Sequence, residues 1–458
     1  MEVIADLEVH SKYARAVSSS MTVPTIAEWA AKKGIGLMGT GDFTHPMWIR
    51  ELEANLEEAG EGSGVYRLRN SKFQIPNSKI ETLFLLTSEV SCIYKDKGKG
   101  RRVHLMIFLP SLSDVRKFNS ELTRMGANLF SDGRPIIGLS LYQVASIAFK
   151  INPKALVVPA HVWTPWFGFY GSESGYESLE EAFKDLTKYI PAVETGLSSD
   201  PAMNWKINEL KNRTIVSFGD AHSPQKLGRE ATVFQYQKSN LKNQNEISKL
   251  KITYEDIYNA IWRNEISDWK IGYTIEFYPE EGKYHYSGHR KCRVVLSPNE
   301  VRKQGLTCPV CGRKLTLGVA SRIEALAKED VQTKSKMSKS GVRFIYDSEE
   351  ERIPYVMMVP LLEIIAEVYK VGATTKGVFE TYEKMIDYFG NEFEILLNAD
   401  LEDLEATFGK NISESIAKVR MGDIFIRPGY DGIFGTVKIW RREEEVPFES
   451  VSGQKTLF

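Results

Sequence analysis

The sequence has little cysteine, no long apolar run and almost no net charge. Three of its four cysteines lie close to histidines, so a disulfide framework is not expected. No run of about 18 apolar residues is present, and the first residues are acidic, which argues against a membrane span or a secretion signal. A formal net charge of −1 argues against a protein that coats nucleic acid without specificity. We therefore expect a cytoplasmic protein with no membrane partner.

Histidine is also scarce, and its placement is informative. Five of the seven histidines lie in five separate segments, beside acidic residues or short apolar runs that have the length of a buried strand. The stretches between these segments have helical spacing. Ligand-type side chains at successive strand ends predict a βα barrel with its site at one mouth. The candidate ligands are Glu8, His10, His45, Glu89, His104, His161, Asp220 and His222.

These residue types suit a metal centre. Histidine and carboxylate ligands without cysteine favour zinc or manganese, and a set rich in carboxylates can bridge several ions. A lone histidine after a strand is more often a hydrogen-bonded core or loop residue. Five such segments with acids at close spacing instead favour a polynuclear site. Asp6 and Asp42 are either ligands or partners that orient a ligand.

The order of these segments resembles that of the PHP metallohydrolases, which use a distorted seven-stranded βα barrel and up to three metals. Their first motif is ordinarily His-x-His, whereas this chain has Glu8-x-His10, so Glu8 would ligate through oxygen. The resemblance implies a first ion on Glu8, His10, Glu89 and Asp220, and a second on Glu89, His104 and His161. It implies a third ion on His45 and His222.

A second metal site is predicted further along the chain. His289-x-x-Cys292 is followed by Cys308-x-x-Cys311, and 15 residues separate the two pairs. Two knuckles with this spacing can close a tetrahedral, structural Zn²⁺ site. Buried free cysteines are the alternative interpretation, and His285 is an alternative to His289 as a ligand.

The segment from Arg290 to Arg343 is basic, with thirteen Lys or Arg against four acidic residues. Such a run is usually a solvated loop. Beside a zinc module and a metallohydrolase, it favours a surface that contacts DNA phosphates through Lys334, Lys336 and Lys339.

These features divide the chain into five parts. We expect a barrel over residues 1–235, a connector over 236–280, a zinc-binding module over 281–320, a mainly helical DNA-binding domain over 321–440 and a flexible tail over 441–458. Helical spacing over 319–328, 359–369, 377–389 and 401–408 supports the helical domain, although an ordinary bundle would show the same pattern. The fold class is therefore α/β, with a helical C-terminal region.

The combination of these parts resembles the endonuclease Q family of DNA repair enzymes, and the resemblance includes the stretch from Glu194 to Pro201. It implies metal-dependent hydrolysis of the phosphodiester bond on the 5′ side of uracil, hypoxanthine, xanthine and abasic sites in DNA. It further implies base flipping and a water activated by two or three catalytic Zn²⁺ ions, with Mg²⁺ or Mn²⁺ as alternatives. Two rivals remain: a small-molecule phosphoesterase of the histidinol phosphatase kind, and a DNA-damage-binding protein without turnover.

Flipping a base requires a pocket with stacking and polar groups. Clustered aromatic residues are more often core than pocket. The candidates for this pocket are Trp163, Trp166, Phe167, Tyr170, Ser198, Ser199 and Asp200.

The last residues contain Gln454, Leu457 and Phe458, which resemble the peptide by which replication and repair proteins bind the DNA sliding clamp. A tail that folds back on its own domain is the alternative.

Overall fold

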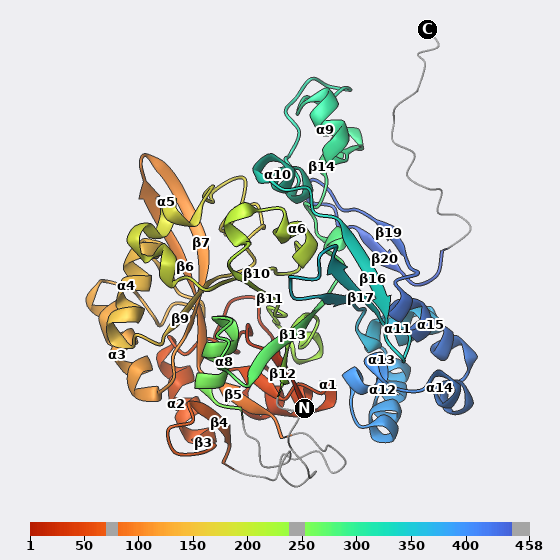
Figure 1. Ribbon diagram of the computed structural model, residues 1–458, viewed down its shortest axis with the longest axis horizontal. Coiled ribbons are helices and arrows are strands. Elements are labelled where there is room, and N and C mark those ends of the chain that lie inside the picture. The colour runs from red at the N-terminus through yellow and green to blue at the C-terminus, as the bar shows by residue number, and fades with distance from the viewer. Residues whose placement is uncertain (70–80, 238–251, 442–458) are drawn as a thin grey trace.

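The computed structural model describes residues 1–69, 81–237 and 252–441 and shows an α/β fold with a helical region toward the C-terminal end (Figure 1). The predicted fold class is confirmed. Within the described residues, no helix has the length and apolar character needed to span a membrane.

Most barrel strands are short and buried, whereas β6 (Thr87–Asp96) and β7 (Lys99–Phe108) are ten residues long and partly exposed where they meet at their turn. The other barrel strands are β1 (Glu2–Asp6), β2 (Leu37–Gly39), β5 (Leu83–Leu85), β9 (Leu156–Pro159), β10 (Ala192–Glu194) and β11 (Thr214–Val216). Parallel pairing joins β1 to β2, β2 to β5 and β10 to β11. The middle is different, because β7 pairs antiparallel with both β6 and β9. These antiparallel pairs interrupt the parallel order of the strands, so the barrel is distorted.

A tight turn produces that antiparallel hairpin. Lys97 and Gly98 both have positive φ, 49° and 80°, which is the backbone of a two-residue hairpin turn. The strand β8 (Ile136–Ile137) adds to β6 in parallel, and the pair β3 (Leu56–Glu58) and β4 (Val65–Leu68) adds antiparallel to β5.

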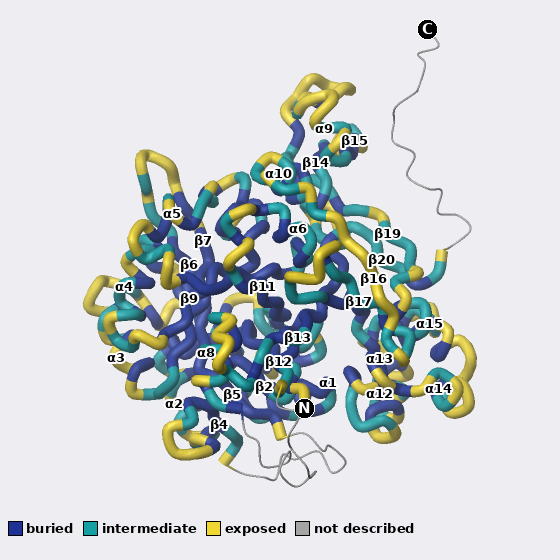
Figure 2. The backbone as a smooth tube through the Cα atoms, viewed as in Figure 1, coloured by how far each residue is buried: buried dark blue, intermediate teal, exposed yellow. Residues whose placement is uncertain are grey.

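Helices between the strands cover the barrel. They are α1 (Val23–Lys33), α2 (Pro46–Asn55), α3 (Leu112–Arg124), α4 (Leu141–Ile151), α5 (Leu179–Phe183) and α6 (Pro201–Trp205). Helix α4 begins with a capping box between Ser140 and Gln143, which satisfies two backbone N–H groups of its first turn. Each of these helices has buried residues, and those of α1, α3 and α4 belong to the same apolar core as strand residues such as Val103 and Leu105 (Figure 2).

The barrel sheet continues beyond the expected barrel boundary at residue 235. β12 (Ala231–Tyr236) pairs antiparallel with β1, and β13 (Trp269–Glu276) pairs with β12. β18 (Tyr355–Met357), β17 (Arg343–Asp347) and β16 (Thr333–Met337) then extend the same sheet. The segment expected to be a connector therefore supplies β13 and helix α8 (Tyr254–Ile261), both integral to the barrel side of the molecule.

The histidine and cysteine motif lies in a small projecting module, at the top of Figure 1. It contains β14 (Ser287–His289), β15 (Val294–Leu296) and α9 (Pro298–Gln304), and α10 (Val319–Leu326) follows it. Its own core has four buried side chains: Val294, Leu296, Cys308 and Leu315. Most of the surrounding chain is exposed (Figure 2).

The C-terminal region is helical and docks on the barrel. Its elements are α11 (Leu361–Tyr369), α12 (Lys376–Phe389), α13 (Glu392–Leu397), α14 (Leu401–Phe408), α15 (Lys410–Met421), β19 (Phe425–Arg427) and β20 (Thr436–Lys438). Lys33 of α1 forms a buried ion pair with Glu392, 2.6 Å apart, and Trp29 stacks on Tyr382. Apolar residues of α11, α12 and α15 belong to the same core as the barrel.

Candidate metal centre

The structure brings seven of the eight candidate barrel ligands together at the strand ends. Glu8 and His10 follow β1, Glu89 lies in β6, and His104 lies in β7. His161 follows β9, and Asp220 and His222 follow β11. The backbone N–H of His10 donates to Ala221 O at 3.2 Å, which ties the end of the first strand to the last motif.

Glu89, His104 and His161 form one compact group of ligand atoms. Glu89 Oε1 lies 2.5 Å from His104 Nδ1 and 3.2 Å from His161 Nε2, and the two histidine nitrogens are 3.0 Å apart. All three residues are buried. Burial lowers the pKa of His104 to about 4, so this ring is held neutral, the form that binds a metal.

Glu8, Glu89 and Asp220 form a second group, with ligand atoms within 4.8 Å of one another. Both carboxylate oxygens of Glu8 are buried and have no hydrogen-bond partner. Burial, together with the carboxylates of Glu194 and Glu89, raises the pKa of Glu8 well above its usual range. Buried acids crowded in this way need a proton or a cation to be stable.

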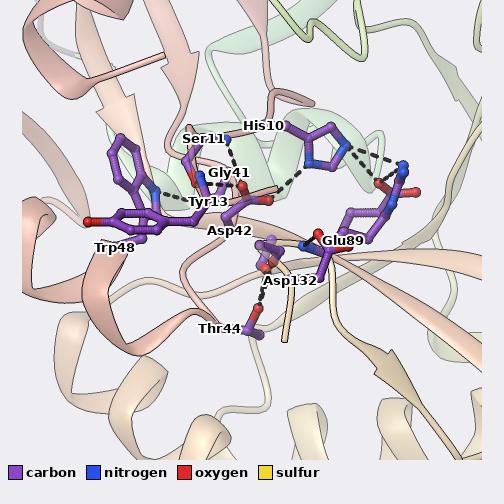
Figure 3. A network of polar contacts seen from close by, with 12 residues as sticks. His10, Ser11, Tyr13, Gly41, Asp42, Thr44, Trp48, Glu89 and Asp132 are labelled. Atoms are coloured by element: carbon purple, nitrogen blue, oxygen red, sulfur yellow. Dashed lines mark hydrogen bonds and ion pairs between the residues drawn. The ribbon is translucent and has the colours of Figure 1, made fainter. Parts of the chain in front are cut away.

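His10 lies between this group and an orienting acid (Figure 3). Its Nε2 is 3.0 Å from Glu89 Oε2 and 3.1 Å from Asp220 Oδ1, whereas its Nδ1 is 2.9 Å from Asp42 Oδ1. Asp42 is itself fixed, because the N–H and hydroxyl of Ser11 donate to its Oδ2 at 2.6 and 2.7 Å. Asp42 therefore acts on the ring of His10, the orienting alternative that the sequence left open.

Asp6, the other acid with two possible roles, supports the backbone near the centre. Its carboxylate accepts from the backbone N–H groups of Gly219 and Gly228, at 2.9 and 2.8 Å. Burial raises the pKa of Asp6 to about 7. Asp6 holds the loop that carries Asp220 and belongs to none of the ligand groups found among the described residues.

The residues expected at a third ion are arranged differently from the prediction. His222 groups with His10 and Asp220. His45 is in none of the ligand groups of the described chain. Its Nδ1 accepts from Met47 N at 3.3 Å, which caps α2, and its ring stacks on Tyr13 at 4.5 Å. In this conformation His45 has a capping role.

Three residues of the centre have unusual backbone conformations. Asp42, His161 and Asp220 have φ values of 46°, 28° and 43°, in the left-handed region that few non-glycine residues adopt. Such strain persists only where the surrounding structure enforces it, and it is common at functional sites.

Two functional residues escaped the sequence reasoning. Glu194 is fully buried, its Oε1 accepts from Gly196 N at 2.8 Å and its Oε2 from His161 N, and burial raises its pKa to about 7. Arg134 Nη1 lies 3.0 Å from Glu89 Oε2. Glu194 lies at the end of a short apolar run, as several predicted ligands do, so its position in the sequence could have identified it as a candidate. Nothing in the sequence around Arg134 distinguishes it from other arginines.

These residues fit a metal centre. The donors are carboxylate oxygens and imidazole nitrogens without sulfur, and the carboxylate of Glu89 faces two groups at once. The unpartnered oxygens of Glu8 are the free donors that an ion requires.

The knuckle residues also converge. One ligand atom from each of His289, Cys292, Cys308 and Cys311 lies within 4.8 Å of the others. Burial acts to raise the pKa of Cys308, but hydrogen bonds from His289 and backbone N–H groups lower it to about 6, which favours the thiolate. The turn after Cys311 uses Gly312 at φ 70°, as expected for a knuckle. His285 is outside this group. The set therefore fits one structural ion held by His289 and the three cysteines.

The aromatic candidates separate into core and cavity residues. Trp163 and Tyr170 are buried and stack on each other, and they donate to Asn204 and Glu209. Both are therefore core residues. Phe167 packs on the ring of His104 at 4.5 Å.

Trp166 and Ser198 instead line a cavity of about 170 Å³ between the barrel and the base of the zinc module. Trp166 is 39% exposed and meets Tyr284 edge to face. Ser199 is buried and donates to Thr195 O, and Asp200 caps α6, so these two residues have local structural partners.

The three lysines singled out in the basic segment lie in a hairpin of β16 and β17, whose first strand is exposed. Lys334 and Lys336 both pair with Glu350, at 2.7 and 2.5 Å. Lys339 lies in the turn between the two strands. Gln454, Leu457 and Phe458 lie outside the described residues.

Comparison with known proteins places the chain in a family. Residues 360–423 match the family described as the MJ0043 C-terminal domain. MJ0043 of Methanocaldococcus jannaschii is 31% identical over 62% of this chain, but the match spans only 32% of that protein. YqxK of Bacillus subtilis is 28% identical over 95% of this chain and 99% of its own length.

Two solved structures match nearly the whole chain. The lesion-specific endonuclease PfuEndoQ from Pyrococcus furiosus has 30% sequence identity and a TM-score of 0.76, and the match covers 99% of this chain and 98% of that one. Endonuclease Q in complex with a 27-mer duplex with an abasic lesion at the active site has 31% identity, the same TM-score and 96% coverage of both chains. The predicted family is confirmed, and this chain belongs to the endonuclease Q family.

Proposed function

We propose that this chain is a metal-dependent DNA repair endonuclease that nicks duplex DNA at lesions. The reaction is hydrolysis of the phosphodiester bond on the 5′ side of uracil, hypoxanthine, xanthine or an abasic site. The ligand groups of the barrel support it. So does the likeness over 96% of the chain to endonuclease Q, whose complex holds an abasic lesion at its active site.

The position of Glu89 is the observation that supports the proposal most strongly. One of its oxygens faces His10, and the other faces His104 and His161. A carboxylate between two ligand groups is suited to bridge two ions. Two ions, if bound there, would stabilise both the attacking and the leaving oxygen of a phosphodiester.

Bound divalent ions would supply Lewis-acid charge and an activated water. The protein's own residues position the ligands. Asp42 fixes the ring of His10, and Glu194 fixes the backbone of His161. We assign Glu8, His10, Glu89 and Asp220 to one ion and Glu89, His104 and His161 to another, with His222 beside His10 and Asp220 for a third. Zinc suits this donor set, with Mn²⁺ or Mg²⁺ as alternatives.

The cavity beside Trp166 is our candidate for the lesion pocket. An unstacked base gains stacking on an exposed indole, and Ser198 offers a polar contact at the same cavity. Lys283 and Tyr284 from the base of the zinc module also line it. We further propose that the zinc module and residues 321–440 contact the duplex.

A nicking assay on labelled duplexes tests the function. Duplexes with one abasic site or one uracil should be cut on the 5′ side of the lesion when Mn²⁺ or Zn²⁺ is supplied, and the undamaged duplex should stay intact. Asp220→Asn, which keeps the shape of the side chain, serves as the matched inactive control.

Other outcomes would contradict the proposal. Release of phosphate from small monoesters without nicking would indicate a phosphoesterase. Lesion binding without either reaction would indicate a damage-binding protein.

We also propose that Gln454, Leu457 and Phe458 bind a DNA sliding clamp, on the sequence alone. Two apolar side chains placed in a clamp pocket would contribute roughly 1.5 to 3 kcal/mol each before ordering costs. Deletion of residues 454–458 should remove clamp binding in calorimetry and spare the nicking of a short duplex. Equal clamp binding by both proteins would contradict the proposal.

A further inference from the structure

Arg134 is the one cation from Lys or Arg that contacts the barrel ligand groups in the described part of the chain. Its Nη1 lies 3.0 Å from Glu89 Oε2 and 3.4 Å from His10 Nε2. Both of these atoms are among those we assign to metal. The guanidinium therefore lies against atoms that an ion would use.

The backbone around Arg134 is fixed, so this contact is built into the fold. Gly133 N donates to Tyr13 O at 3.0 Å, and Thr44 donates to Gly133 O at 3.2 Å. On the other side, Ser91 N donates to Pro135 O at 3.0 Å. A Cβ on Gly133 would lie 2.3 Å from Asp42 Oδ2, so only glycine lets this loop approach the orienting acid.

The side chain, in contrast, has room to move. It is 25% exposed, whereas Glu89 is 2% exposed. Its positive charge lies against Glu89, which shares a ligand group with the carboxylates of Glu8 and Asp220. The guanidinium therefore compensates the negative charge of the ligand groups.

We propose that Arg134 occupies the metal centre when it holds no ion and, when ions displace it, turns to bind the DNA phosphate that is cut. The single lone pair of His10 Nε2 cannot serve both an ion and a guanidinium, and an ion on Glu89 Oε2 would repel the guanidinium charge beside it. The side chain of Arg134 is 25% exposed, and phosphate oxygens are the partners that suit a displaced planar guanidinium best. The second half of this inference rests on the proposed function, and the first half does not.

Metal binding without DNA tests the first half. Mn²⁺, which a thiolate site does not favour, is titrated into protein that retains its knuckle zinc. Arg134→Ala should bind Mn²⁺ at least about tenfold more tightly than the unaltered protein, because no cation has to be displaced. Arg134→Lys should lie between the two. Arg15→Ala is the matched control, since Arg15 pairs with Asp132 near the same loop, and its affinity should not change. Equal Mn²⁺ affinity in all four proteins would overturn the proposal.

Nicking of a lesion duplex tests the second half. At saturating Mn²⁺, Arg134→Ala should raise KM for the duplex and lower kcat/KM by about 10-fold or more, although its metal centre fills more easily. Arg134→Lys should recover part of this loss. Full activity of Arg134→Ala at saturating metal would overturn the phosphate role. No nicking by the unaltered protein, with a changed Mn²⁺ affinity in Arg134→Ala, would contradict the proposed function and leave the first half intact.

Discussion

The barrel centre and the knuckle position their candidate metal ligands in opposite ways. The barrel ligands come from residues 8 to 222, and the strands beneath them belong to the large cores of the molecule. The knuckle ligands come from residues 289 to 311, and the apolar cluster of their module consists of Val294, Leu296, Leu315 and the ligand Cys308. A large core can hold ligands in place without an ion, whereas a small module depends on the ion for its folding energy. Ions held in the barrel would therefore be free for chemistry, whereas an ion on the knuckle would be structural.

The largest effect is expected in the barrel. Asp220→Asn and His10→Ala should each reduce nicking by more than about 100-fold, while the melting temperature changes little, because Asp220 belongs to two ligand groups and His10 contacts both Glu89 and Asp220. Nicking rates and thermal melts check this. Nearly full nicking by either variant would place the chemistry elsewhere.

The knuckle should show the opposite pattern. Cys308→Ser should release one zinc and remove hydrogen-exchange protection from residues 287–316, while the barrel amides stay protected. Metal analysis and hydrogen exchange provide the measurement. An unchanged zinc content would show that this residue is not a ligand.

An intermediate effect is expected where the fold supports the barrel ligands. Asp42→Asn should lower metal affinity or activity about 10- to 100-fold, because a neutral amide replaces the carboxylate that orients the ring of His10. Asparagine also accepts the left-handed backbone found at this position, so the fold should survive. A loss as large as that of Asp220→Asn would indicate that Asp42 is itself a ligand.

The smallest effect is expected on the basic hairpin. Replacing Lys334, Lys336 and Lys339 by Ala should weaken binding to all DNA sequences alike and reduce the salt slope by about 1 per lost phosphate contact. Glu350→Gln should act in the opposite direction, because it frees two lysines from their carboxylate partner. DNA titrations at several salt concentrations measure both. Unchanged slopes would assign the hairpin to the solvated surface.

The sequence was most informative where one residue type recurs at strand ends. The candidate barrel ligands follow from residue type beside short apolar runs, and the knuckle follows from spacing, whereas the division of the barrel ligands into groups was implied by the family resemblance. The third site was less predictable, since His45 has the right residue type and a local role as a helix cap. A histidine ring serves both purposes, and only the fold decides between them.

Long-range pairing was the main feature that the sequence did not reveal. The segment over 236–280 looked like a connector, yet β13 lies inside the barrel sheet. The exposed strand β16 carries lysine and serine rather than alternating apolar residues, as edge strands often do, so its pattern indicated a loop. Arg134 was missed for a similar reason, because its loop reaches Glu89 only through contacts with Tyr13, Thr44 and Ser91.

The most direct test is to locate bound metals by anomalous diffraction from crystals soaked in Mn²⁺ or Zn²⁺. Our account predicts one ion among Glu8, His10, Glu89 and Asp220, a second among Glu89, His104 and His161, and a separate zinc on the knuckle. A filled knuckle beside a barrel that takes up no ion would contradict it.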